Sequence, residues 1–342
     1  MQQEVKILAF ESSCDDTSCA VLRAQPNEPM PKILSMSIQS QNEIHEKFGG
    51  VVPELASRAH LENLIPCLEK ALAESGVSLS DIDIFAATAR PGLVGCLLVG
   101  HTAAKTLAYT FNKKFISCNH LESHLLSAYL EETPQFPVLS LLASGGHTSL
   151  YYSTDYDHFE VLGQTLDDAC GEAFDKGAKL LGLGFPGGSF LEKMARDGNP
   201  NAFEFGVVRV EGMNLSFSGL KSQMNRYMQK EEASRHADLA ASYQKSIFDH
   251  IIAKMNRALE ERPVMSLAIV GGVARNQELR DRIKKLSEKF RLNKILIPSM
   301  SLCTDNAAMI GARAFRHFLR SEFSSLDDDV GSTSRPPVRH AG

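Results

Sequence analysis

Residues 5–22 read VKILAFESSCDDTSCAVL, and residues 138–152 read VLSLLASGGHTSLYY. Each stretch is an apolar run, a turn of small polar residues and a second run, a pattern that predicts a β-hairpin. The turns, at 11–17 and 144–148, can offer backbone N–H groups and hydroxyls to a ligand. The same local unit therefore occurs twice in one chain.

Each predicted hairpin is followed later by a strand–turn–helix unit. Residues 82–88 lead through the turn at 90–92 into a helix, and residues 265–270 lead through Gly271 and Gly272 into another. We therefore expect an α/β protein of two related halves that face a cleft. The alternative is an ordinary mixed α/β protein whose local turns are merely similar.

Composition limits the classes of protein that need to be considered. The chain has 342 residues, 43% hydrophobic and 23% charged, which is ordinary for a globular protein and long enough for two domains. The net charge of -5 excludes a protein built around bulk phosphate neutralisation, so nucleic acid must be contacted through local patches or a partner. The seven cysteines are dispersed without a CxxC pair, as is typical of reduced thiols. We expect a cytoplasmic protein, or a mitochondrial matrix protein if the chain is a processed form.

His120 and His124 are candidate metal ligands. Residues four apart on a helix lie on one face, so both imidazoles can reach one ion, and Asp305 is the best candidate for a third ligand. Leu121 stands where the protease motif H-E-x-x-H needs its glutamate, which argues against a zinc protease. The alternative interpretation of the pair is one surface histidine and one core histidine.

Two glycine turns are candidate anion cradles, because glycines let backbone N–H groups approach a phosphate closely. They are the Ser144-Gly145-Gly146 turn and the Gly271-Gly272 turn, which opens a helix. Asn276 can hydrogen-bond a sugar or a base, and Asp175 can bind ribose hydroxyls. The alternatives are tight turns without a ligand and a surface pair of Asp175 with Lys176.

Two other motifs are rejected as sites. The run 182–187 matches G-x-G-x-x-G, but it follows a helical pattern and contains a proline, so it is not a dinucleotide fingerprint. Residues 218–221 match S-x-x-K without the motifs that accompany it in acyl-serine enzymes. The glycine run can still close over a ligand.

Residues 53–75 predict an amphipathic helix, in which Pro66 favours a kink or a break. We expect its leucine stripe to face the core. The stripe consists of Leu55, Leu61, Leu64, Leu68 and Leu72. The segment 321–342 contains three aspartates in a row, glycine, serine and two prolines, a composition that predicts disorder.

Taken together, the segments closely resemble the tRNA N6-adenosine threonylcarbamoyltransferase family, in its bacterial branch. The matching pieces run from about residue 7 to about residue 315. They are ILAFESSCDDTSCAVL, FGGVVPELASRAHLEN, ATARPGLVGCLLVGHTAAKTLA, NHLESHLLSAYLE, LLASGGHTSLYY, LGQTLDDACGEAFDKGAKLLGLGFPGG, LSFSGLKS, GGVARNQELR and LCTDNAAMIGARA.

The resemblance implies an α/β fold of two actin-like (ASKHA, ribonuclease H-like) lobes around a central cleft. It divides the chain into an N-terminal lobe over 1–125, completed by 307–320, and a C-terminal lobe over 126–306. Because Asp305 then belongs to the second lobe, we expect the metal site to need both lobes.

The resemblance also implies the site residues. His120, His124 and Asp305 are expected to bind one metal, usually Fe(2+) or Zn(2+). The residues expected to line the threonylcarbamoyl-adenylate site are Leu142, Ala143, Ser144, Gly145, Gly146, Asp175, Gly188 and Asn276. No catalytic general base is assigned, since a weak amine nucleophile depends more on positioning.

The implied activity is transfer of the threonylcarbamoyl group from threonylcarbamoyl-adenylate to N6 of the adenosine 3′ of the anticodon, in tRNAs reading codons that begin with A. The implied partners are tRNA, a TsaB-like paralogue and a TsaE-like ATPase. The alternatives are a metalloendopeptidase, a non-catalytic scaffold of the same complex and, by fold analogy alone, an ATP-dependent kinase or chaperone.

The sequence departs from the family's usual pattern at three positions. Arg90 and Ser123 stand where glycine is usual, and Asn119 replaces a frequent histidine. A glycine at position 90 can serve a left-handed turn, so Arg90 raises the question of the local backbone.

Overall fold

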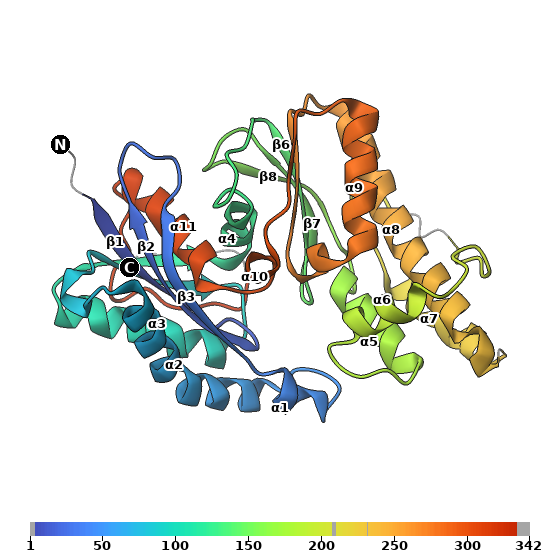
Figure 1. The fold of residues 1–342 in the computed structure, drawn as a ribbon, viewed down its shortest axis with the longest axis horizontal. Coiled ribbons are helices and arrows are strands. Elements are labelled where there is room, and N and C mark those ends of the chain that lie inside the picture. Colours follow the sequence, from blue (N-terminus) through green and yellow to red (C-terminus); the bar gives the residue numbers. More distant parts are fainter. Residues whose placement is uncertain (1–3, 207–209, 231, 334–342) are drawn as a thin grey trace, which may run out of the picture. The chain divides into compact units, whose positions relative to one another are not determined.

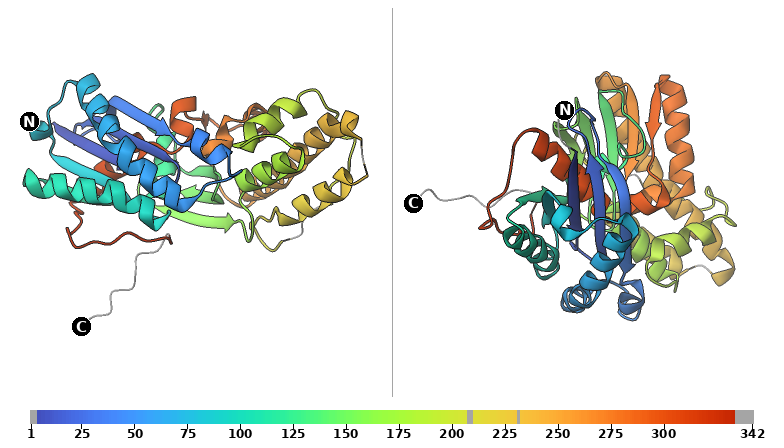
Figure 2. Two further views of the ribbon diagram at one scale, coloured as in Figure 1. Left: turned by 90° about the horizontal axis from the view of Figure 1, so that it is seen from below. Right: turned by 60° about the vertical axis from the view of Figure 1, so that its left-hand side comes forward.

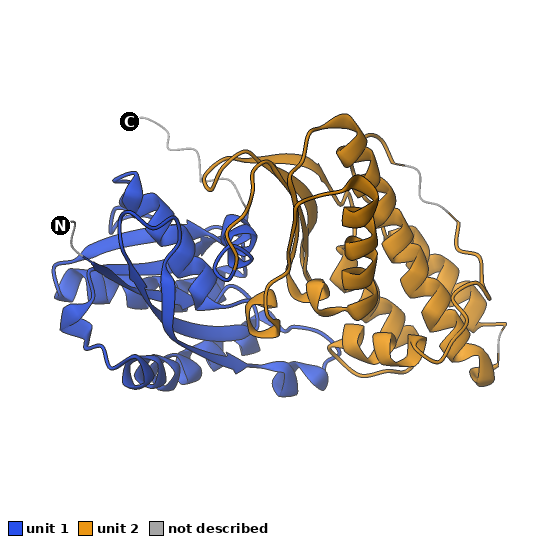
Figure 3. Ribbon diagram, turned by 45° about the horizontal axis from the view of Figure 1, so that its top comes forward, with its two compact units in different colours: residues 1–131, 305–342 blue, residues 132–304 orange. Residues whose placement is uncertain are grey.

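The computed structural model of the chain describes residues 4–206, 210–230 and 232–333 (Figure 1). These residues form two compact units (Figure 3). Unit 1 comprises Met1–Glu131 and Asp305–Gly342, and unit 2 comprises Glu132–Thr304. The first boundary between the units follows residue 131, six residues after the boundary expected from the sequence. The second follows residue 304, two residues before the expected one, and this places Asp305 in unit 1.

Unit 1 contains a sheet and the helices packed on it. Its elements are β1 (Val5–Glu11), β2 (Asp16–Ala24), β3 (Lys32–Ser40), α1 (Asn42–Glu46), α2 (Pro53–Ser75), η1 (Leu79–Asp81), β4 (Ile84–Arg90), α3 (Val94–Thr110), β5 (Lys114–Asn119), α4 (His120–Ser127) and α11 (Ala307–Leu319).

Unit 2 has a second sheet and a larger group of helices. Its elements are β6 (Val138–Ala143), β7 (Thr148–Ser153), β8 (Phe159–Gln164), α5 (Cys170–Leu180), α6 (Gly187–Ala195), α7 (Ser218–Met228), η2 (Ala233–Arg235), α8 (His236–Glu261), β9 (Ser266–Val270), η3 (Gly272–Arg275), α9 (Gln277–Phe290), β10 (Lys294–Leu296) and α10 (Met300–Cys303).

The two sheets have the same topology. The strand order is β3-β2-β1-β4-β5 in unit 1 and β8-β7-β6-β9-β10 in unit 2, each with five strands. In both, the first three strands of the unit pair antiparallel as a meander, and the last two add in parallel on the other side of the first strand. The expectation of two related α/β halves is confirmed.

The first strand of unit 1 is apolar on both faces because both faces are covered. Leu8 and Phe10 pack with residues of α2 and α3 in one apolar cluster. Ile7 pairs across the sheet with Leu22, whose side chain lies against Gly311 of α11, so this helix covers the opposite face. Two further views show the helices on both sides of this sheet (Figure 2).

Helix α2 confirms the predicted helix but not the whole predicted core stripe. It runs unbroken from Pro53 to Ser75 with Pro66 inside, so the expected break does not occur. Leu64 and Leu68 are buried against the sheet, whereas Leu61 is 65% exposed. Packing of α2 on the sheet outweighs the hydrogen bond lost at the proline.

The predicted disorder of 321–342 is wrong for its first part. The backbone N–H of Ser324 donates to the Phe115 carbonyl at 2.9 Å, and that of Gly331 donates to the Ala89 carbonyl at 2.9 Å. Arg90 Nη2 donates to the Asp329 carbonyl at 2.9 Å, and Lys105 Nζ to that of Asp328. Composition misled here because backbone and side-chain donors of unit 1 hold this segment; residues 334–342 lie outside the described residues.

Close to this C-terminal segment lies the buried side chain of His101, one of whose ring nitrogens, Nε2, is 3.1 Å from Ser117 Oγ. Burial, with a contribution from Lys105, lowers the pKa of His101 to about 4. The unfolded chain, with an ordinary histidine pKa near ~6.5, takes up this proton first. The contribution of neutral His101 to stability is therefore fully present above that pKa, and it is lost as the pH falls towards 4.

Between pH 6.5 and pH 4, we expect the unfolding free energy of the wild-type protein to fall further than that of His101→Gln. The difference between the two losses should be at most about 3 kcal/mol. Glutamine can still hydrogen-bond Ser117 but does not ionise. Urea titrations of both proteins at the two pH values measure the difference. Equal losses would show that His101 does not carry this acid sensitivity.

In the part of the chain that the structure describes, none of the helices has the length and apolar character needed to cross a membrane.

Candidate metal centre and anion-binding loops

The helix that carries both histidines begins at a well-defined cap. Asn119 ends β5, and its side-chain oxygen accepts from the N–H groups of Leu121 at 2.9 Å and Glu122 at 3.3 Å. This is the usual role of asparagine at a helix N-terminus, so the departure at position 119 has a structural explanation. The cap starts α4 at His120 and places His124 one turn later.

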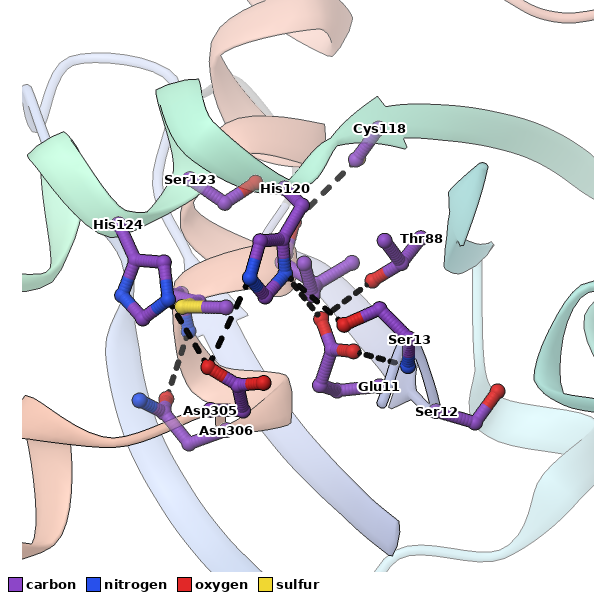
Figure 4. A network of polar contacts seen from close by, with 12 residues as sticks. Glu11, Ser12, Ser13, Thr88, Cys118, His120, Ser123, His124, Asp305 and Asn306 are labelled. Carbon is purple, nitrogen blue, oxygen red and sulfur yellow. Dashed lines mark hydrogen bonds and ion pairs between the residues drawn. The ribbon is translucent and has the colours of Figure 1, made fainter. Parts of the chain in front are cut away.

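The two histidines and Asp305 form one group (Figure 4). His124 Nε2 lies 3.0 Å from Asp305 Oδ1, and His120 Nε2 lies 3.6 Å from the same oxygen. The three ligand atoms lie within 4.8 Å of one another. Two imidazole nitrogens and a carboxylate are a donor set that suits zinc or iron, and three protein ligands leave a coordination position open. The residues present fit a metal ion.

All three ligand candidates belong to unit 1. Asp305 stands at the point where this unit takes up the chain again, and Asn306 then caps α11 by accepting from the Met309 N–H at 3.0 Å. The expectation that the group needs both lobes is therefore wrong. It is built from the β5–α4 junction and the start of α11, two elements that pack together within unit 1.

Glu11, at the end of β1, is a member of this site that was not predicted from the sequence. Its fully buried carboxylate lies 3.1 Å from His120 Nδ1. It also accepts from the Ser13 N–H at 2.6 Å and from the Thr88 hydroxyl at 2.6 Å. Burial would raise the pKa of Glu11, but the contact with His120 holds the pKa below its ordinary value. A glutamate that directly follows the apolar run 7–10 is the signal that could have revealed it.

The carboxylates around the histidines leave the site rich in negative charge. Burial alone would lower the pKa of His120, but Asp305 and Glu11 raise it to about 9. Burial, with the nearby charges of Asp305 and Asp15, raises the pKa of Asp16 to about 8. Protons thus compensate part of the charge when no cation is bound, and a divalent cation can take over that role.

The other two departures from the family pattern are also accommodated. Ser123 is buried, and its hydroxyl donates to the Asn119 carbonyl at 2.7 Å. The non-glycine residues with left-handed backbone in the described chain are Asn112, Arg291 and Ser321. Arg90 is not among them, so its backbone does not need a glycine.

In unit 2, the predicted anion loop after β6 adjoins two other chain segments. The Gly171 N–H, at the start of α5, donates to the Ser144 carbonyl at 3.1 Å. Gly271, after β9, has φ of +91°, and a Cβ there would lie 2.3 Å from the Ala143 oxygen. Glycine at 271 is therefore required by both backbone and space. The ends of β6 and β9 and the start of α5 meet at this loop.

Three other glycines have no such requirement. A Cβ at Gly145, Gly146 or Gly272 would meet nothing within 4 Å, and none of the three has a left-handed backbone. Side chains there would extend into open space that a ligand can use. Leu142 and Ala143 are almost fully buried, so neither presents an exposed side chain to a ligand.

The remaining predicted substrate residues lie at, or contact, helix starts in the same unit. The Asp175 carboxylate accepts from the Gly187 N–H at 2.7 Å, beside Gly188 at the start of α6. Asn276 caps α9 by accepting from the Leu279 N–H at 3.2 Å, and its amide donates to Gln244 at 2.9 Å.

Glu192 of α6 was not predicted. Its carboxylate accepts from the Gln277 N–H at 3.1 Å, which joins the second turn of α6 to the start of α9. This hydrogen bond links α6, which carries Gly188, to α9, which follows Asn276.

The two rejected motifs are structural. The run 182–187 follows helix α5 rather than a strand, as expected. The Ser218 hydroxyl donates to Asp167 at 2.7 Å, and the same carboxylate accepts from the Phe217 N–H at 2.8 Å. Asp167 thus caps the start of α7, and the Ser218 hydroxyl is one of the donors that bind this carboxylate.

The duplicated five-stranded sheet places the chain among the actin-like α/β proteins. Comparison with solved structures agrees at the level of fold. Thermococcus kodakarensis HypF matches with a TM-score of 0.62 and 16% identity, over 93% of this chain and 49% of that one. Component A of the Acidaminococcus fermentans (R)-2-hydroxyglutaryl-CoA dehydratase matches with a TM-score of 0.52 and 14% identity, over 91% and 97%.

Sequence comparison identifies the family. The model of the TsaD family, tRNA N6-adenosine threonylcarbamoyltransferase, matches residues 32–312. The tRNA N6-adenosine threonylcarbamoyltransferase of Clostridium kluyveri is 45% identical over 335 residues, 96% of each chain. That of Christiangramia forsetii is 42% identical over 344 residues, covering 97% of this chain and 98% of that one. The chain belongs to the tRNA N6-adenosine threonylcarbamoyltransferase family.

Proposed function

We propose that this protein transfers the threonylcarbamoyl group from threonylcarbamoyl-adenylate to N6 of the adenosine 3′ of the anticodon, in tRNAs reading codons that begin with A. The observation that carries the proposal is the relationship to transferases of this name over nearly the whole length of both chains. The residues expected for the metal and the adenylate are all present, which argues against a non-catalytic scaffold.

Unit 2 supplies the groups that suit the adenylate. The open glycine positions at 145, 146 and 272 leave room for phosphate oxygens to approach backbone N–H groups. The positive ends of α5, α6 and α9 add favourable charge. The Asp175 carboxylate contacts the start of α6 and Asn276 caps α9, where exchange of their present partners for ribose hydroxyls or base edges would fix the nucleoside.

The reaction forms a bond between N6 and the carbamoyl carbon and breaks the bond from that carbon to the phosphate oxygen. AMP leaves with the bonding electrons, and the amine loses one proton. Phosphate is a good leaving group and the aromatic amine is a weak nucleophile, so holding the two partners in line contributes more than a strong base. The backbone N–H groups of the glycine loops can stabilise the charge that develops on the departing phosphate.

We propose that His120, His124 and Asp305 hold one divalent metal, Fe(2+) or alternatively Zn(2+). When bound there, such an ion acts as a Lewis acid towards a carbonyl or phosphoryl oxygen. The protein's part is to keep two imidazole nitrogens and one carboxylate oxygen directed at a single point, with a coordination position left open.

The helix that carries the two histidines gives less support to the protease alternative than to the transferase. Leu121 occupies the position of the general base in H-E-x-x-H, and it is buried. Glu122, the next acidic group along the helix, is ion-paired to Arg313 at 2.7 Å.

We propose that the protein acts with a TsaB-like paralogue and a TsaE-like ATPase, in the cytoplasm. Exposed apolar side chains support a protein partner. Leu61 and Ile65 lie one turn apart on α2, and Val94 and Leu98 one turn apart on α3, each about half exposed or more. The two helices approach closely, because a Cβ at Gly95 would lie 3.4 Å from the Ser57 Cβ. Such a surface suits a partner that presents helices of its own.

Leu61→Glu and Leu98→Glu are expected to weaken binding of the TsaB-like paralogue by about 30-fold or more, since each buries a charge in the proposed contact. The fold should not change, because both side chains are exposed. Tyr109→Glu, at an exposed position near the end of α3, is the matched control. Titration calorimetry measures the affinities. Wild-type affinity in both leucine variants would remove this surface from the proposal.

The function itself is tested by nucleoside analysis of tRNA after incubation with the protein, both partners and threonylcarbamoyl-adenylate. Threonylcarbamoyladenosine should form in tRNAs that read codons beginning with A. Cleavage of protein substrates without any change in tRNA would instead favour the endopeptidase.

A further inference from the structure

We propose that Glu11 is a positioning residue of the metal centre: its carboxylate holds the His120 ring so that Nδ1 carries the proton and Nε2 faces the metal. The inference rests on the proposed metal function of His120, His124 and Asp305. It assigns a role to a side chain that does not itself belong to the ligand group.

The His120 ring lies between two carboxylates, one on each nitrogen. Nδ1 is 3.1 Å from Glu11 Oε2, and Nε2 is 3.6 Å from Asp305 Oδ1 (Figure 4). The neutral imidazole that binds a metal has one N–H donor and one lone pair. Glu11 can only accept a hydrogen bond when ionised, so it selects the tautomer with the proton on Nδ1. The lone pair of Nε2 is then directed at the ligand group.

Glu11 is itself held in place from two sides. The Ser13 N–H occupies Oε1, and the Thr88 hydroxyl donates to Oε2, which also faces His120. Thr88 lies on β4, the strand that pairs in parallel with β1. The carboxylate is fully buried and is surrounded by donors, an arrangement that a rigid orienting group requires.

The second histidine has no equivalent support. His124 Nδ1 is buried and has no hydrogen-bond partner among the described residues. The two ligand histidines therefore differ, and the tautomer of His120 is the one that the protein specifies. The effect of Glu11 should be specific to that ring.

Glu11→Gln separates this role from simple packing, because glutamine keeps the shape but has one acceptor oxygen. If that oxygen faces the Ser13 N–H, the amide NH₂ faces His120 Nδ1 and favours the wrong tautomer. If the amide is flipped, its NH₂ opposes the Ser13 N–H. Either way, orientation of His120 is lost while volume is retained.

The test uses metal-free full-length protein and measures zinc binding by competition with a chelator. Glu11→Gln is expected to weaken zinc binding by roughly 10- to 100-fold. It should also alter the visible absorption spectrum of the cobalt(II)-loaded protein. Glu122→Gln is the matched control, an identical change on α4 whose carboxylate pairs with Arg313, and it should bind zinc like the wild type.

Ser13→Ala addresses the other group near the same nitrogen, since Ser13 Oγ lies 3.3 Å from His120 Nδ1. Wild-type zinc affinity and cobalt spectrum in folded Glu11→Gln protein would overturn the proposal, as would a loss caused by Ser13→Ala alone. Failure of the wild-type protein to bind zinc or cobalt would instead remove the metal centre itself, and the role of Glu11 with it.

A measurement on the wild-type protein avoids dependence on a variant that folds poorly. Long-range ¹H–¹⁵N spectra of the zinc-loaded protein report which nitrogen of each histidine is protonated. We expect His120 with a protonated Nδ1 and a metal-bound Nε2. A metal-bound Nδ1 at His120 would contradict the geometry proposed for Glu11.

Discussion

Asp305→Ala is expected to reduce metal affinity by on the order of 100-fold or more and to abolish transfer to tRNA, with little change in thermal stability. The carboxylate is one of three ligand groups, so its loss leaves only the two imidazoles. Burial, with a contribution from Asp305, raises the pKa values of Asp15 and Asp16, so the substitution relieves a repulsion. It also removes the contacts of Asp305 with His120 and His124, and the two opposite effects on stability are expected to offset each other.

Elemental analysis, a tRNA transfer assay and a thermal melt measure the three quantities on the same preparation. Asp281→Ala, an exposed aspartate of α9 in unit 2, is the control and should retain metal and activity. Full transfer activity in metal-depleted Asp305→Ala protein would show that a metal at this site has no part in the reaction.

Gly272→Ala and Gly271→Ala are expected to affect different properties: the first lowers the affinity for the adenylate, and the second lowers the stability of the fold. At Gly272 a methyl group meets no protein atom within 4 Å, so the fold should be unaffected while the space for the adenylate is reduced. We expect adenylate affinity to fall by about tenfold or more with unchanged melting, since displaced phosphate contacts are charge-assisted hydrogen bonds.

At Gly271 the left-handed backbone and the clash with the Ala143 oxygen should together cost roughly 2–6 kcal/mol of unfolding free energy. Calorimetry with a non-hydrolysable adenylate analogue and a thermal melt distinguish the two variants. Gly272→Ala protein that binds the analogue like the wild type would show that this turn does not contact the ligand.

The sequence patterns that depend on neighbouring residues predicted the structure well. The strand–turn–strand units at 5–22 and 138–152 became β1–β2 and β6–β7, because alternation and turn residues are local signals. The i, i+4 histidines share a face of α4 for the same reason. The helix 53–75 was predicted, but the exposure of Leu61 was not. Periodicity shows which residues share one side of a helix, but it does not show how much of that side the sheet covers.

What the sequence could not supply depends on contacts between distant residues. Glu11 lies 109 residues from His120, and only the sheet, in which β4 lies between β1 and β5, brings their side chains together. Asp305 was predicted as a ligand but was placed in the wrong unit, because no change in composition marks the point where the chain returns to unit 1. The segment around Ser324–Gly331 looked disordered by composition, yet its partners are backbone and basic groups elsewhere in unit 1.

Transfer of the threonylcarbamoyl group is measured by mass spectrometry of nucleosides from one unmodified tRNA that reads a codon beginning with A. The tRNA is incubated with this protein, its TsaB-like and TsaE-like partners and threonylcarbamoyl-adenylate. A parallel reaction omits only this protein. We expect threonylcarbamoyladenosine at the position 3′ of the anticodon in the complete reaction and none in the parallel one. An unmodified adenosine in the complete reaction, or equal modification without this protein, would contradict the proposed transfer.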